Sequence, residues 1–252
     1  MDARSKIGLQ EDAVNVEFPR ALQQRFEQAI VEGELARDQA WSLGELADRF
    51  QVPADPMQRV VGAALRKGLL AEAEGGAWRV LGLPTTQFSS VFTHTAGSGF
   101  KPRSEVRQVA VEVATPLVAE KLQVEPGSPV YRYVRTRWVN EEALANQTNY
   151  MPFEVCPGLE GDDVTRYSFQ KLLEEKYHAV LVDMQEQYSL VPSTERDRAV
   201  LGLPEGAAVL VVDRVALSAS GWPLVWADIR IRPDRFEYVA TLWPQAAELL
   251  KP

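Results

Sequence analysis

Residues 122–130 read LQVEPGSPV, and residues 201–209 read LGLPEGAAV. The two stretches share a leucine, an apolar residue, a glycine and a valine at matching positions, 79 residues apart. At the same offset, Arg135 falls on Arg214. In each copy the glycine indicates a turn, because glycine reaches backbone conformations that other residues avoid. The chain therefore contains an internal repeat, and this repeat indicates the fold of the longer, C-terminal part of the chain.

Each copy of the repeat is predicted to contain a helix followed by two strands that a turn joins. A further helix and strand lie between the copies. The predicted helices cover residues 116–122, about 168–177, and 194–201, and the predicted strands cover 130–139, 143–151, about 180–190, 209–217 and 224–231. Strands joined by hairpins pair antiparallel, and helices must cover such a sheet, so the fold class is α+β. The duplication suggests a cavity near a pseudo-twofold axis, although it is also simply a way to build a core.

The first part of the chain reads as three helices and a hairpin, over residues 18–81. Ser42 followed by Glu45 forms the capping box that begins the second helix. Gly68 ends the third helix, and Gly75-Gly76 is a hairpin turn. This order favours a winged helix-turn-helix over a generic small helical domain. We therefore expect a winged helix-turn-helix at residues 16–82, a linker at 83–90, and a second domain at 91–247.

Composition and charge limit the classes of protein that this chain can be. The net charge is −8, and even the part before Pro84 carries ten Lys or Arg against thirteen Asp or Glu, which counts against bulk affinity for nucleic acid. No apolar run is long enough to span a bilayer, and residues 1–20 do not resemble a signal peptide. Cys156 is the only cysteine, so an internal disulfide is excluded. We expect a cytoplasmic protein without membrane contact.

A set of short motifs resembles one family in both order and spacing. The motifs are Arg135-Thr136-Arg137, Tyr150-Met151-Pro152, the repeated glycine turns, Gly221-Trp222-Pro223 and Arg232-Pro233-Asp234-Arg235-Phe236. Over roughly residues 18–240 the chain resembles GntR-type transcription regulators of the HutC subfamily. The resemblance implies a winged helix followed by a UTRA effector domain with a chorismate-lyase-like fold. It also implies a homodimer that binds double-stranded operator DNA, acts as a repressor, and responds to a small anionic metabolite.

Two arginines are the central candidates for effector binding. Arg135 and Arg137 are two positions apart on a predicted strand, so both project from one face and need anions nearby. A ligand would supply these anions, or acidic residues of a neighbouring strand would. The resemblance adds further effector-site residues, which are Thr93, His94, Gln147 and Ser168. His94 is also compatible with an exposed loop position, and Ser168 with a plain helix cap.

Other positions narrow the class of effector. Sugar-binding members of the resembled family place acids and a tyrosine where this chain has Gln147, Val225, Ile231 and Gln170. Flat apolar surface is instead offered by Tyr133, Trp222 and Trp226. The expected effector is therefore a small organic anion with an apolar or aromatic part, and not an amino sugar.

The DNA-reading surface departs from the family pattern. The family places arginines where this chain has Gly44, Ala54 and Gln58, and a serine where it has Pro53. The remaining candidates for DNA contact are Ser42, Gln58, Arg59 and Arg79. Arg66 and Lys67 lie in the last helical turn, where cations favour the helix dipole without any DNA. DNA binding is expected to be weak, altered or lost, and in the last case the protein is a ligand-binding dimer.

An enzyme of the same fold, a small-molecule lyase, is the third hypothesis. His94 and His178 are the only histidines, and neither has carboxylate or cysteine companions at metal-ligand spacing. The chain has no phosphate-binding glycine loop and no nucleophile elbow. We therefore expect a protein that is not an enzyme and that uses no cofactor and no metal.

Overall fold

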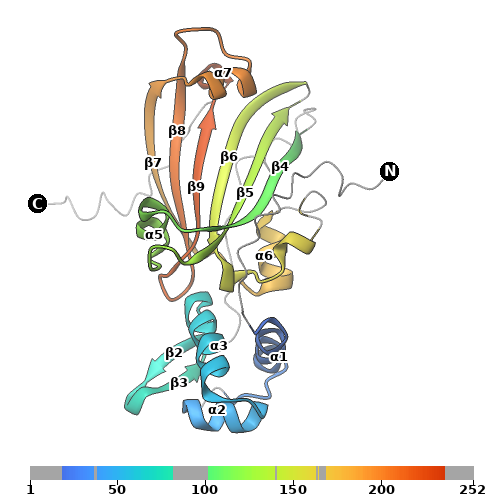
Figure 1. Ribbon diagram of the computed structural model, residues 1–252, viewed down its shortest axis with the longest axis vertical. Coiled ribbons are helices and arrows are strands. Elements are labelled where there is room, and N and C mark those ends of the chain that lie inside the picture. Colours follow the sequence, from blue (N-terminus) through green and yellow to red (C-terminus); the bar gives the residue numbers. More distant parts are fainter. Residues whose placement is uncertain are drawn as a thin grey trace, which may run out of the picture.

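The computed structural model describes residues 19–36, 39–81, 102–139, 141–162, 164 and 169–235. The helices and strands form two units. A small unit of three helices and a three-stranded sheet lies at one end of the molecule, and a six-stranded sheet with helices occupies the rest (Figure 1). We call them the winged helix and the sheet domain.

The winged helix begins with α1 (Arg20–Val31), continues through β1 (Ala40–Trp41), α2 (Leu43–Phe50) and α3 (Ala54–Lys67), and closes with the hairpin of β2 (Leu70–Ala73) and β3 (Ala77–Val80). The predicted capping box is present, since the backbone N–H of Glu45 donates to the Ser42 hydroxyl and the Ser42 N–H donates to the Glu45 carboxylate at 2.7 Å. Gly68 ends α3 with φ +74°, as predicted.

Apolar side chains on the inner faces of these helices form the core of the winged helix. Phe26, Leu46, Phe50, Met57 and Val60 are all buried in it. The short strand β1 was not predicted; it pairs with β3 through Ala40 opposite Arg79 and Trp41 opposite Trp78. Two residues are too few for a hydrophobic period to be read.

The sheet domain is built on one antiparallel sheet with the strand order β4-β5-β6-β9-β8-β7. Its strands are β4 (Pro102–Val113), β5 (Pro129–Val139), β6 (Glu142–Pro152), β7 (Asp183–Pro192), β8 (Ala208–Leu217) and β9 (Pro223–Ile231). Because β6 and β9 pair at the centre, the two halves are arranged about a pseudo-twofold axis. The α+β fold that the repeat predicted is confirmed.

Strand β4 was missed at the level of sequence. It pairs with β5 along its whole length, from Pro102 opposite Val139 to Val113 opposite Pro129. At the repeat offset of 79 residues it falls on β7, so the repeated unit is strand, helix, strand, strand rather than helix, strand, strand. The repeat offset therefore predicts β4 when the repeated unit is taken to begin one strand before its helix.

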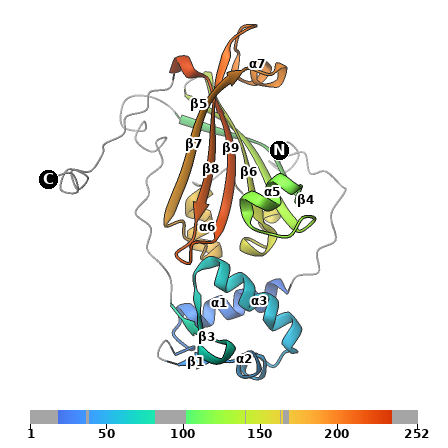
Figure 2. The same cartoon turned by 90° about the vertical axis from the view of Figure 1, so that its left-hand side faces the viewer.

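Helices cover both faces of the sheet. Helix α6 (Phe169–Tyr177) lies on one face, whereas α5 (Pro116–Leu122) and α7 (Glu195–Leu201) lie on the other (Figures 1 and 2). The face under α6 carries the largest apolar cluster, which includes Tyr131, Tyr133, Phe153 and Leu173. The two faces of the sheet therefore have separate cores. The face from which a side chain projects determines which of the helices it contacts.

Candidate functional site: two arginines on one face of the sheet

The two candidate arginines lie on the α6 face of β5. Arg135 is only 8% exposed, and its Nε donates to Gln147 Oε1 across the β5–β6 pair at 2.9 Å. Its guanidinium stands 5.6 Å from the centre of the Tyr133 ring. Arg137 donates to the hydroxyl of Ser104, its partner on β4, at 3.2 Å. Both arginines therefore project from one face of the sheet, as predicted.

A relay of amides holds Arg135 in place. Gln147 accepts from Arg135 and donates through Nε2 to Asn149 Oδ1 at 2.7 Å. Asn149 in turn donates to the backbone carbonyl of Tyr133 at 3.2 Å. All three side chains are buried, so this relay fixes the guanidinium without supplying any negative charge. Asn149 was not a predicted site residue; its signal was the alternation that places it two residues from Gln147.

Burial and neighbouring positive charges penalise the charged forms of both arginines. Burial, above all, lowers the pKa of Arg135 from its ordinary value, and the positive charge of Arg214 adds to this. Burial also lowers the pKa of Arg137 to about 9, with the charge of Arg135 as the second cause. Since an adjacent anion favours the charged form of a base, an anionic ligand would reverse this penalty.

A third arginine of the same face comes from the second copy of the repeat. Arg214 on β8 donates through Nε to Glu186 Oε1 at 2.5 Å. Along the sheet it lies in one row with Asn149 and Ala227, next to the row that holds Arg135. The repeat therefore places a third guanidinium on this face, and Glu186 is its carboxylate partner.

Apolar side chains border the arginines on the same face. In the row that contains Arg135, Gln147 is opposite Ile229, and Ile229 is opposite Val212. The neighbouring row adds Ala145 and Ile231, and these two residues form one buried apolar cluster with Ile229 and Val212. The site thus combines cations with an apolar wall.

Three predicted effector-site residues, Thr93, His94 and Ser168, lie outside the described residues. The structure does describe Phe169, the first residue of α6, whose ring stacks on Tyr133 at 4.7 Å. Helix α6 therefore begins beside the ring over which Arg135 lies.

The expectation that Tyr133, Trp222 and Trp226 share one surface is wrong. Trp226 points to the opposite face, where it stacks on Tyr150 and donates to Asp213 at 3.0 Å. Trp222 lies in the turn before β9 and contacts Arg66 of the winged helix. Alternation along β9 explains the error, since Val225 and not Trp226 shares the face of Tyr133.

The candidate DNA-contact residues lie on the winged helix. Gln58, Arg59 and Arg79 are exposed, whereas Ser42 is occupied by its capping box. Arg59 forms an ion pair at 2.8 Å with Asp55, one turn earlier on α3. Asp55 therefore pairs with Arg59, which is one of the remaining candidates for DNA contact.

The helix-dipole interpretation of Arg66 and Lys67 needs correction. Lys67 is fully buried, where its Nζ donates to Glu27 at 2.6 Å and to the carbonyl of Tyr177 in the sheet domain at 2.6 Å. Arg66 pairs with Glu154 of the sheet domain at 2.7 Å. Both cations hold the two units together.

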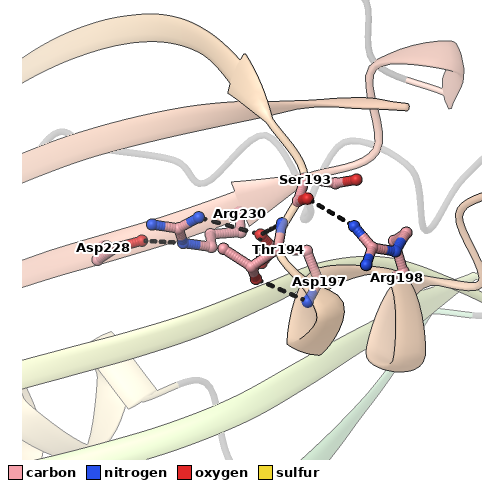
Figure 3. Close-up of polar contacts among 6 residues, drawn as sticks. All are labelled: Ser193, Thr194, Asp197, Arg198, Asp228 and Arg230. Atoms are coloured by element: carbon pink, nitrogen blue, oxygen red, sulfur yellow. Dashed lines mark hydrogen bonds and ion pairs between the residues drawn. The ribbon is translucent and has the colours of Figure 1, made fainter. Parts of the chain in front are cut away.

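A second polar cluster lies at the far end of the sheet, where α7 begins (Figure 3). Asp197 caps α7 with Thr194 and accepts from Arg230 at 3.1 Å, and Arg230 also pairs with Asp228 at 3.3 Å. Burial opposes ionisation of Asp197, but hydrogen bonds from Thr194 and the charge of Arg230 together lower its pKa. The charged groups of this cluster pair with one another, so we assign the cluster a structural role.

Other classes of site find no support in the described part of the chain. No group of three or more His, Cys, Asp or Glu there is arranged to hold a metal ion. Within the same residues, no helix is long and apolar enough to cross a membrane. Cys156 is a fully buried free cysteine, and burial raises the pKa of its thiol.

Comparison with known proteins identifies the sheet domain. The family model of the UTRA domain matches residues 97–237. The chain is 29% identical over 136 residues to the HTH-type transcriptional regulator GmuR of Bacillus subtilis, and the match spans 54% of this chain and 57% of GmuR. It is 24% identical over 217 residues to the HTH-type transcriptional repressor NagR of the same organism, across 83% of this chain and 88% of NagR.

Solved structures show the same arrangement. The crystal structure of PhnF from Mycobacterium smegmatis aligns with a TM-score of 0.58 at 16% identity, over 88% of this chain and 99% of PhnF. The C-terminal domain of Yurk from Bacillus subtilis aligns with a TM-score of 0.51 at 21% identity, over 54% of this chain and 92% of that domain. The chain therefore belongs to the UTRA-domain family, and its winged helix and sheet domain share the fold of PhnF.

Proposed function

We propose that the protein is a homodimeric repressor that binds operator DNA through its winged helix and senses a small organic anion at Arg135 and Arg137. The observation that carries the proposal is the pair formed by the buried Arg135 and the half-buried Arg137. Burial lowers the pKa of both, and the relay that holds Arg135 supplies no charge. An anion that accepts hydrogen bonds from both would offset this penalty, with about 1.5–3 kcal/mol for each charge-assisted bond.

The apolar wall beside the arginines indicates the rest of the ligand. Ile229, Ile231 and Val212 offer no hydrogen bonds from their side chains, and Gln147 is engaged by Arg135 and Asn149. A polyhydroxylated ligand would leave its hydroxyls unpaired against such a wall, which is costly. We therefore infer a carboxylate or phosphate with an apolar or aromatic part.

Names of the relatives support regulation rather than catalysis. GmuR and NagR are named as transcriptional regulators, and NagR is named a repressor. Their names do not describe enzymes, which supports the expectation that this chain is not an enzyme. The proposal of a homodimer is supported by the general pairing of such motifs with twofold-symmetric operators.

A second candidate is a ligand-binding dimer whose winged helix no longer reads DNA. It is favoured by the Asp55–Arg59 ion pair and by the acidic charge of the chain. Selection of bound sequences from random duplexes at low ionic strength separates the two candidates. Enrichment of an inverted repeat supports the repressor, and no enrichment supports the second candidate.

The anion site is tested by thermal unfolding in a library of carboxylate and phosphate metabolites. A ligand that binds the folded state raises the unfolding midpoint by mass action. We expect at least one anion with an apolar part to raise the midpoint of the wild type and to leave Arg135→Gln/Arg137→Gln unchanged. Arg196→Gln, an exposed arginine of α7, is the control, and it should respond as the wild type does. Equal shifts in all three proteins, or shifts with amino sugars alone, would refute the assignment.

A further inference from the structure

Arg66 connects the winged helix to three separate elements of the sheet domain. Its Nε pairs with Glu154 Oε1 at 2.7 Å, and its NH1 donates to the carbonyl of Leu122 at the end of α5 at 3.2 Å. Its guanidinium also stands 5.0 Å from the centre of the Trp222 ring. Only 13% of its side chain is exposed. A single side chain of α3 is thus held from three directions.

The backbone around Arg66 is in close contact with the sheet domain as well. The hydroxyl of Ser220 donates to the carbonyl of Leu65 at 2.8 Å. At Gly68, an added Cβ would lie 3.1 Å from the Cβ of Ala219, so the two chains pass close together. Figure 2 shows α3 directly beneath the ends of the strands. The C-terminal end of α3 is therefore docked on the turn between β8 and β9.

Arg66 also belongs to the helix face that is left for DNA. Asp55, Arg59 and Gly62 are exposed on α3, and the spacing of four, three and four residues from Asp55 to Arg66 keeps all four on one side of the helix. The buried face of the helix carries Met57, Val60 and Val61 instead. Docking therefore withdraws one cation from the face on which Arg59 lies.

We propose that the contact of Arg66 with Glu154 and Trp222 is an autoinhibitory latch, which holds the winged helix on the sheet domain and keeps Arg66 from DNA phosphates. When the latch opens, Arg66 joins Arg59 on the recognition face. Arginine grips a phosphate with two parallel hydrogen bonds, so its release strengthens DNA binding. This inference rests on the proposed DNA-binding function.

The latch can be opened by substitutions in the sheet domain, which leave the sequence of the winged helix unchanged. Glu154→Ala/Trp222→Ala removes two partners of Arg66, and both side chains are partly exposed, so the core remains intact. Glu205→Ala, in an exposed turn, removes the same charge as Glu154→Ala and is the matched control. Affinity for a random-sequence duplex at low ionic strength is measured by fluorescence anisotropy.

We expect the opened variant to bind DNA about tenfold more tightly than the wild type and Glu205→Ala, which is the contribution of one charge-assisted hydrogen bond. Adding Arg66→Ala to the opened variant should remove the gain. Equal affinity of the opened variant and the control, or a gain that survives Arg66→Ala, would overturn the latch alone. No DNA binding by any of these proteins would overturn the latch and the repressor together.

Opening is measured independently of DNA. Spin labels at Asp48→Cys on α2 and Ser189→Cys on β7 report the distance between the two units, and the buried Cys156 does not react. The wild type should give one narrow distance distribution and the opened variant a broad one. A broad distribution in the wild type, or an unchanged narrow one in the variant, contradicts the latch.

Discussion

Arg135 and Arg137 carry positive charges that oppose folding, and the same charges are suited to binding an anion. Each places a positive charge where burial lowers its pKa, and Arg137 is penalised further by Arg135. Gln147 and Ser104 accept hydrogen bonds from them but carry no charge. Burial of these two charges opposes folding, and an anion bound beside them would offset that penalty.

The cost can be measured at Arg137. Because its pKa in the folded protein is lowered to about 9, the charged form destabilises the fold below that pH, and the penalty disappears as the pH rises toward the ordinary arginine pKa. Arg137→Gln should raise the free energy of unfolding at neutral pH by about 2 kcal/mol. Urea denaturation at pH 7 and pH 10 checks this. The account is contradicted if Arg137→Gln raises the free energy of unfolding as much at pH 10 as at pH 7, or lowers it at pH 7.

Asp197 should behave in the opposite way. Its pKa is lowered in the folded state, so its contribution to stability is present above about pH 4 and is lost as the pH falls through the folded pKa. Asp197→Asn should lower the free energy of unfolding by about 2 kcal/mol at neutral pH, because Thr194 and Arg230 lose a charged partner. The difference between the two proteins should shrink in acid. A pH-independent difference would show that charge is not its cause.

At the scale of the element, local signals in the sequence were sufficient for most of the fold. The capping box at Ser42, the end of α3 at Gly68 and the bounds of α5 depend on neighbouring residues alone, and all three are found in the structure. The strand β1 is too short for its pattern to be read, and its pairing with β3 depends on distant contacts. Alternation likewise could not assign Trp226 to a face before the register of β9 was known.

The candidate site was only partly predictable for a related reason. That Arg135 and Arg137 share a face follows from their spacing, but the partners that hold them come from β4 and β6. Which residues are opposite one another depends on strand register and on the bulge between Val106 and Gln108. Gln147 was suggested by family resemblance, and Asn149 could have been added because alternation places it on the same face, two residues away.

The helix caps provide a test at this scale. Ser42→Ala removes the hydroxyl that accepts from the Glu45 N–H and donates to the Glu45 carboxylate, and it leaves the bond from the backbone N–H of residue 42 in place. We expect it to lower the free energy of unfolding of the winged helix by about 1 kcal/mol. Ser189→Ala, an exposed serine in a strand, is the control and should change little. Hydrogen exchange of the α2 amides locates the effect. Equal losses in both variants would contradict a specific cap.

At the scale of the whole molecule, the contact between the two units depends on a buried ion pair. Lys67 and Glu27 both belong to the winged helix, yet Lys67 also donates to the carbonyl of Tyr177, and Gln23 bridges Glu27 to the carbonyl of Glu154. Nothing in the sequence near Lys67 indicates these partners, because they come from distant parts of the chain. Docking of the two units therefore adds a carbonyl acceptor for the buried Lys67.

Removing one member of this pair should be more harmful than removing both. Lys67→Met leaves Glu27 buried without its cation and should lower the free energy of unfolding by about 3–5 kcal/mol. The double variant Lys67→Met/Glu27→Leu should regain most of that loss, since an apolar pair of similar volume fits the same space. Thermal or denaturant unfolding of the two variants gives the comparison. Equal losses in both would show that the charges are not buried together.

The central claim is that anion binding at Arg135 and Arg137 controls DNA binding by the winged helix. It is tested most directly by the affinity for a selected operator duplex, with and without the anion that most raises the unfolding midpoint. The account predicts that this anion weakens DNA binding of the wild type about tenfold and leaves that of Arg135→Gln/Arg137→Gln unchanged. An affinity that the anion does not alter in the wild type, or alters equally in both proteins, would contradict it.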